Sequence, residues 1–220
     1  MTEAQIANHL ERAASYRYLS LLFVPPTQEV SDELVSLAGS VDPSLRDDAE
    51  ALGKSTGRAL QGLFHKVLGA AGQVPDGECG YDDNTAGGRG PLLADVAGFY
   101  RAFAFEAPAG QTMDHAACEL GFMGWLAMKE AFARHEGDEE HRSITEDARH
   151  RFVKDHLGRW MLAFLERMAQ VAEGTHYEAV ATLSSRTLKA LEGAEALSHP
   201  SRRKRLPVID DPPDVDACGV

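Results

Sequence analysis

Cysteine is scarce in this chain, and its three copies lie far apart. Cys79, Cys118 and Cys218 are odd in number and form no Cys-x-x-Cys pair. A disulfide-stabilised fold needs an even set of cysteines, and common zinc and redox motifs need close pairs. The sequence therefore excludes a disulfide framework and gives no sign of a cysteine-based metal or redox site.

Long apolar runs are also missing. No segment approaches the roughly 20 apolar residues that a membrane-spanning helix requires. Residues 1–10 lack the basic and apolar regions of a secretory signal peptide. We therefore expect the protein to remain in the reducing cytoplasm, without stable insertion into a membrane.

Basic residues are the minority among the charged ones. The 220 residues include 22 Lys and Arg against 34 Asp and Glu, for a formal net charge of -12. Such a charge repels the phosphate backbone of nucleic acids and attracts basic molecules. The composition argues against nucleic-acid binding and favours a basic partner.

Apolar residues recur at helical spacing throughout, and no stretch shows the alternation typical of a strand. The sequence therefore predicts an all-α fold. Capping residues and prolines place the first boundaries, with Thr2 and Gln5 as a capping box and Asp42-Pro43 as a helix start. The expected helices are one from the Thr2 cap to Pro25-Pro26, a short segment after Thr27, 42–68 with a kink at its glycines, 92–105, 112–135, 139–167 with a break near Gly158, and 175–191, opened by a capping box of Thr175 and Glu178.

The domain organisation follows from two breaks in this pattern. Residues 72–90 are rich in Gly, Pro, Asp and Asn, which indicates a linker or hinge between two closely packed helical subdomains. Its glycines could also cradle a phosphate, but their spacing matches no nucleotide-binding motif. We expect one helical domain over residues 1–193 and a disordered tail over 194–220, which contains a basic run at 202–205.

One pair of residues is a candidate for chemistry. Asp114 and His115 follow Thr112, which we expect to cap a helix, and Glu119 lies one turn later on the same face. The pair is either a plain helix start with a partly buried histidine or a polar site. As a site, it offers an acceptor and a titratable donor suited to a peptide backbone or an arginine.

Aromatic residues are concentrated in the same part of the chain. Such residues usually belong to a hydrophobic core, but they can also line a groove for an apolar peptide, with acidic groups at the rim. We predict that four of them form such a groove: Phe99, Tyr100, Phe103 and Trp125.

A metal-binding helical bundle is the main alternative. Asp147-x-x-His150 and Glu173-x-x-His176 imitate the Glu-x-x-His element of di-iron bundles, and other His and Glu residues are near them in sequence. The additional inward-facing glutamates of such a bundle are not identifiable. No nucleophile motif is present, because the chain has no Gly-x-Ser-x-Gly elbow. We expect no enzymatic activity, no metal and no cofactor.

Three segments carry a resemblance to a known family. They are Leu93-Ala-Asp-Val-Ala-Gly-Phe-Tyr-Arg-Ala-Phe103, Asp114-His115-Ala-Ala-Cys-Glu119-Leu-Gly-Phe-Met123 and Phe152-Val-Lys-Asp-His156-Leu-Gly-Arg-Trp160. In this order they resemble the TorD/DmsD/NarJ family of cytoplasmic molybdoenzyme maturation chaperones. The likeness covers about a third of the chain strongly, and the N-terminal helices agree only in pattern.

The resemblance implies an all-helical chaperone for a molybdopterin oxidoreductase subunit. Such a chaperone binds the twin-arginine signal peptide of its client and assists folding and cofactor insertion before export. In the family an Asp-His pair near the hinge contributes to peptide binding, and Asp114 and His115 match it. We predict that Asp114 and Glu119 engage the basic end of the peptide, with His115 as part of the same peptide-binding site. The family often has Glu and Pro directly before this pair, whereas this chain has Thr112-Met113. A monomer and a domain-swapped dimer are both compatible with the pattern.

Overall fold

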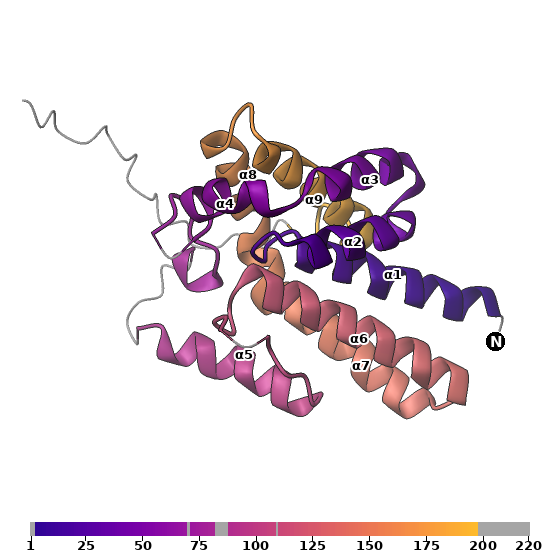
Figure 1. Ribbon diagram of the computed structural model, residues 1–220. Coiled ribbons are helices and arrows are strands. Elements are labelled where there is room, and N and C mark those ends of the chain that lie inside the picture. Colours follow the sequence, from indigo (N-terminus) through magenta and orange to yellow (C-terminus); the bar gives the residue numbers. More distant parts are fainter. Residues whose placement is uncertain (1–2, 70, 82–87, 109, 198–220) are drawn as a thin grey trace, which may run out of the picture.

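A computed structural model describes residues 3–69, 71–81, 88–108 and 110–197 (Figure 1). Over these residues the regular elements are helices, with no β-strand, as the sequence predicts. In chain order they are α1 (Glu3–Leu21), α2 (Gln28–Leu37), η1 (Ala38–Ser40), η2 (Pro43–Leu45), α3 (Arg46–Ser55), η3 (Arg58–Leu60), α4 (Gln61–Val67), η4 (Glu78–Gly80), α5 (Gly90–Ala102), α6 (Ala116–Glu136), α7 (Glu139–Phe152), the π-helix η6 (Val153–Leu157), α8 (Gly158–Val171) and α9 (His176–Glu192).

Helix α6 is the centre of the fold. It runs beside both α1 and α7 (Figure 1) and is buried over most of its length. The contact with α1 is close because Gly124 has no side chain: a Cβ there would lie 3.2 Å from the Ala13 carbonyl oxygen and the Tyr16 Cβ. Helices α1 to α9 all contribute to one connected hydrophobic core. The division into two subdomains at residues 72–90 stays a prediction.

The long helix predicted for residues 42–68 is wrong in its continuity. Asp42 does cap a helical turn that begins with Pro43, but α3 ends at Ser55 and the backbone is extended at Thr56 and Gly57 before α4. Gly53 lets α3 approach α2 closely, because a Cβ would lie 3.0 Å from the Val35 backbone nitrogen. The chain therefore turns after Ser55, at a point where the helical period of the sequence predicts that the helix continues.

One predicted helix start differs in position, and a second is confirmed in position but capped differently. Helix α6 begins at Ala116 rather than near Thr112, because the His115 side chain is the N-cap and accepts the Ala117 N–H. At α9, Thr175 is the N-cap residue but its side chain makes no capping bond, and the Glu178 carboxylate accepts the Gly174 N–H instead. The predicted cap at Thr2 lies outside the described residues.

The predicted break near Gly158 is confirmed and has a defined form. Residues Val153–Leu157 form a π-helix between α7 and α8, so that one bundle helix becomes two. A Cβ at Gly158 would lie 2.6 Å from the carbonyl oxygens of both Val153 and Ala196. Only glycine fits at this crossing, which brings residues 194–197 against the start of α8. π-Turns of this kind occur frequently at functional sites.

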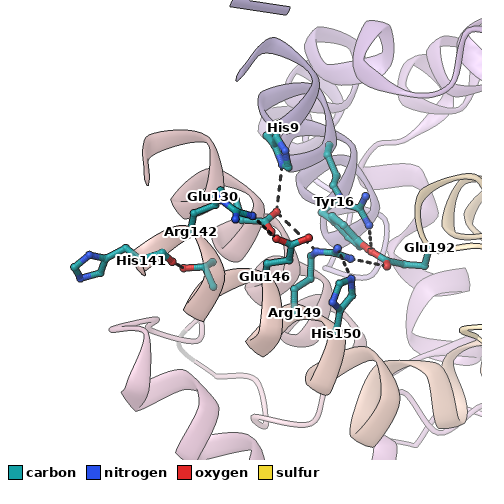
Figure 2. A network of polar contacts seen from close by, with 11 residues as sticks. His9, Tyr16, Glu130, His141, Arg142, Glu146, Arg149, His150 and Glu192 are labelled. Carbon is teal, nitrogen blue, oxygen red and sulfur yellow. Dashed lines mark hydrogen bonds and ion pairs between the residues drawn. The ribbon is translucent and has the colours of Figure 1, made fainter. Parts of the chain in front are cut away.

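A buried polar network joins four helices of the bundle (Figure 2). The Arg149 guanidinium donates to Glu192 over 2.9 Å and lies 3.8 Å from Glu130. Arg12 and Tyr16 also donate to the Glu192 carboxylate. The network connects α1, α6, α7 and α9, and its charges compensate one another, so we assign it to stability rather than to binding.

The described helices include none that is long and apolar enough to cross a bilayer. Two predictions fall partly outside the described residues: the linker predicted for residues 72–90, at positions 82–87, and the tail, beyond Leu197.

Candidate functional site

The Asp114-His115 pair is held against the segment before η4. Gly77 and His115 form an isolated antiparallel bridge, and the Glu78 N–H donates to the Asp114 carbonyl oxygen over 2.9 Å. The Asp114 carboxylate accepts the Cys79 N–H at 3.0 Å. The start of α6 is therefore connected by hydrogen bonds to residues that are 35 positions earlier in the chain.

Asp114 is a buried carboxylate that remains ionised. Burial alone would raise its pKa, but hydrogen bonds from Cys79 and Thr112 and the charge of Arg89 lower the pKa below its usual value. The Arg89 guanidinium lies 3.7 Å from the carboxylate, while its own side chain is 65% exposed. An arginine supplied by the chain itself thus covers the carboxylate that the sequence predicts as an arginine acceptor.

Glu119 lies in the interior beside the same helix start. Its carboxylate accepts the Trp160 indole N–H over 2.9 Å. Burial, followed by the neighbouring negative charge of Glu78, raises the pKa of Glu119 well above its usual value. Glu119 connects α6 to α8 and has no exposed surface for a partner to contact in this conformation.

A chain of polar contacts runs from this interior to the surface. The buried Glu78 carboxylate lies 2.9 Å from His156 Nδ1, and His156 Nε2 lies 3.3 Å from the Asp95 carboxylate. Asp95 is on α5 and its side chain is 67% exposed. The π-helix places His156 between these two carboxylates. Asp95 is therefore the accessible end of the acidic cluster Asp95, Glu78, Glu119 and Asp114.

The raised pKa of Glu119 gives a stability prediction. Folding disfavours the charged form, so the Glu119 contribution is fully present at low pH and is lost as pH rises above the unfolded-state pKa. Glu119→Gln cannot ionise and keeps an oxygen for Trp160. We expect its melting temperature to exceed that of the unmodified protein at pH 8. The shift should be roughly 2–4 °C for each kcal/mol of unfolding free energy that ionisation of Glu119 removes, and it should vanish near pH ~4. Thermal scans across pH measure this difference, and a constant offset at every pH would contradict it.

A groove of about 460 Å³ begins at Asp95 and lies between α5 and α7. Its apolar wall includes Phe99, Phe103 and the half-exposed Ile144. Charged side chains at its edge are Asp95, Asp147 and Arg151. Grooves of this size and lining hold apolar ligands with a few orienting polar groups.

The structure brings some predicted aromatic residues together and separates others. Phe99 and Phe103 line the α5/α7 groove. Tyr100 is buried beneath them, where its ring packs against Phe122 and its hydroxyl donates to the Met113 carbonyl oxygen. Trp125 instead lines a second groove between α1 and α6, and its indole N–H donates to the Phe103 carbonyl oxygen.

The sequence prediction missed part of the site. Glu78 was assigned to a linker, and nothing in a Gly- and Asp-rich segment shows that one carboxylate will be buried beside Glu119. Arg89 also carries no local signal. Asp95 and His156 could have been found, because they belong to the first and third segments of the family resemblance, but their contact depends on the π-helix.

Two of the acidic and histidine residues in and near the di-iron-like motifs have other partners. Glu119 accepts from Trp160, and His150 lies beside Arg149. Among the residues described, no group of three or more His, Cys, Asp or Glu side chains could hold a metal ion. No observation of this structure favours the di-iron alternative.

Comparison with known proteins bears on the same region. No curated protein and no solved structure matches the chain. A family model described as nitrate reductase delta subunit matches residues 61–166. The matched segment contains the acidic cluster, the π-helix and both walls of the α5/α7 groove. The match over these residues supports the nitrate reductase delta subunit family, the NarJ and TorD type of chaperones.

Proposed function

We propose that this protein is a chaperone that binds the twin-arginine signal peptide of a molybdopterin oxidoreductase subunit. Its family is one of molybdoenzyme maturation chaperones rather than enzymes. The finer proposal rests on one observation above all: an apolar groove that begins at an exposed carboxylate. A signal peptide presents the complementary arrangement, with paired arginines followed by an apolar segment.

The two halves of the peptide would meet different parts of the groove. Its apolar segment would lie on Phe99, Phe103 and Ile144 between α5 and α7. Its arginines would meet Asp95 first, because that carboxylate is exposed whereas Asp114 is buried. Guanidinium groups pair well with carboxylates in such settings.

Deeper engagement of the peptide would involve the predicted Asp114-His115 pair. Arg89 already lies beside Asp114 on an exposed side chain. A peptide arginine would reach Asp114 by displacing the Arg89 guanidinium, which exchanges one ion pair for another. Glu119 would then act from the interior, by holding Trp160 and the start of α6 in place.

The experiment is calorimetric titration of the full chain with a synthetic twin-arginine signal peptide and with the same peptide in which both arginines are alanine. We expect micromolar or tighter binding that is weakened by the replacement. If both peptides bound with equal affinity, the acidic cluster would not contribute to binding through the arginines. No binding to peptides from several molybdoenzyme families would contradict the proposed function.

Replacing Asp95 tests the entry point of the arginines. Asp95→Asn removes an exposed charge, so the fold should be retained while affinity for the twin-arginine peptide falls about threefold to tenfold, more at low salt. The matched control is Glu173→Gln, which removes an exposed carboxylate after α8 and should leave affinity unchanged. Equal effects of the two substitutions would indicate attraction by net charge alone.

A further inference from the structure

A segment of the chain itself has the composition of the proposed ligand. Beyond the last described residue, the sequence reads Ser201-Arg-Arg-Lys-Arg-Leu-Pro-Val-Ile209. A basic run that begins with paired arginines is thus followed directly by a short apolar stretch. The proposed function leaves this segment unused.

The described chain ends beside the candidate site. Leu197 is buried, and the Ala196 carbonyl oxygen lies so close to Gly158 that a Cβ there would be 2.6 Å away. Gly158 directly follows the π-helix, which carries His156, and His156 contacts Asp95 at the edge of the groove. The tail therefore starts on the same side of the fold as the acidic cluster.

The length of the segment fits the groove. Arg202 is five positions after Leu197, and five extended residues reach about 17 Å. Asp95 and Phe103 are eight positions apart on α5, which corresponds to about 12 Å of helix. The four residues from Leu206 to Ile209 span about 13 Å when extended. With its basic residues at Asp95, a segment of this length has its apolar residues along the groove.

The charges are complementary. Residues 1–197 contain 18 basic and 30 acidic residues, so they carry the whole net charge of -12. Residues 202–205 carry four positive charges and no negative one. The segment faces a body of opposite charge from a tether only a few residues long. Such a tether gives an effective concentration of about 1 mM.

From these observations we infer that residues 202–209 bind in the α5/α7 groove of the same chain and compete there with the twin-arginine peptide. The competition rests on the proposed function, whereas occupation of the groove by the tail does not. If the isolated segment binds with a Kd of about 100 μM, a tether at about 1 mM fills the groove in about nine molecules of ten. The apparent affinity for an external peptide then falls about tenfold.

Crosslinking tests occupation of the groove directly. A photoreactive amino acid in place of Ile144, in the full chain, should crosslink to residues 202–209, as identified by mass spectrometry of the monomer band. The same amino acid in place of Thr182, which lines a groove between α3 and α9, should not. Arg202→Gln with Arg203→Gln should abolish the crosslink, and Asp210→Asn with Asp211→Asn should retain it. Absence of the crosslink, crosslinks between two chains only, or equal capture at both positions would overturn the inference.

Titration tests the competition separately. The Arg202→Gln, Arg203→Gln chain should bind the twin-arginine peptide about tenfold more tightly than the unmodified chain, and the Asp210→Asn, Asp211→Asn chain should behave like the unmodified one. Equal affinities for the unmodified and arginine-substituted chains would overturn the competition. If neither chain binds the peptide, the proposed function fails, and the Ile144 crosslink alone decides whether the tail occupies the groove.

Discussion

Gly98→Trp is expected to lower the affinity for a twin-arginine peptide at least tenfold without lowering the melting temperature. Gly98 lines the α5/α7 groove, and a Cβ built on it meets no atom within 4 Å. An indole can therefore extend into the groove and occupy the volume that the peptide needs. Replacing glycine within a helix also removes an entropic cost of roughly 0.5–1 kcal/mol. Calorimetric titration and thermal unfolding measure the two effects.

Two glycine substitutions serve as controls. Gly98→Ala gives the same relief to the helix but fills little of the groove, so affinity should stay within about twofold. Gly62→Trp places an indole on α4, where the Cβ also meets open space, but away from the groove. Peptide binding by Gly98→Trp as tight as by Gly62→Trp would place the binding surface elsewhere.

Trp160→Ala is expected to destabilise the fold by about 3–5 kcal/mol, the range for truncation of a buried large aromatic residue. Trp160 is almost fully buried, and its ring packs against Tyr81 and Phe164 at centroid distances of 5.5 Å. Its N–H is also a hydrogen-bond donor to the buried Glu119. Truncation therefore creates a cavity and removes a partner from a buried carboxylate. The midpoint of urea unfolding measures the loss.

The other tryptophan of the chain is the natural control. Trp125 is only partly buried, donates to the Phe103 carbonyl oxygen and lies 4.9 Å from the Lys129 ammonium. Because its cavity would be open to water, Trp125→Ala should cost about 1–2 kcal/mol. If both substitutions lowered the free energy of unfolding equally, the buried Glu119–Trp160 contact would not stabilise the fold as expected.

The helix boundaries show where local sequence rules succeed and where they fail. Asp42-Pro43 starts a helical turn as predicted, because capping and proline geometry are properties of a few adjacent residues. The sequence predicts that α6 starts at Thr112, whereas it starts at Ala116. The residue that caps it is His115, which is fixed by its bridge to Gly77. Local rules cannot include a partner that arrives from another part of the chain.

The candidate site divides in the same way. The sequence by itself determined the all-α class, the acidic net charge, and the choice of the Asp114-His115 and aromatic segments as candidates. Composition and helical period are properties of neighbouring residues, so they can be recognised without the tertiary structure. Only the tertiary structure decided that Glu119 is buried against Glu78 and Trp160, that Arg89 covers Asp114, and that Asp95 stands at the end of the groove. These contacts join residues that are far apart in sequence. The π-helix, the glycine at position 158 and the hydrogen bonds across residues 76–79 bring them together.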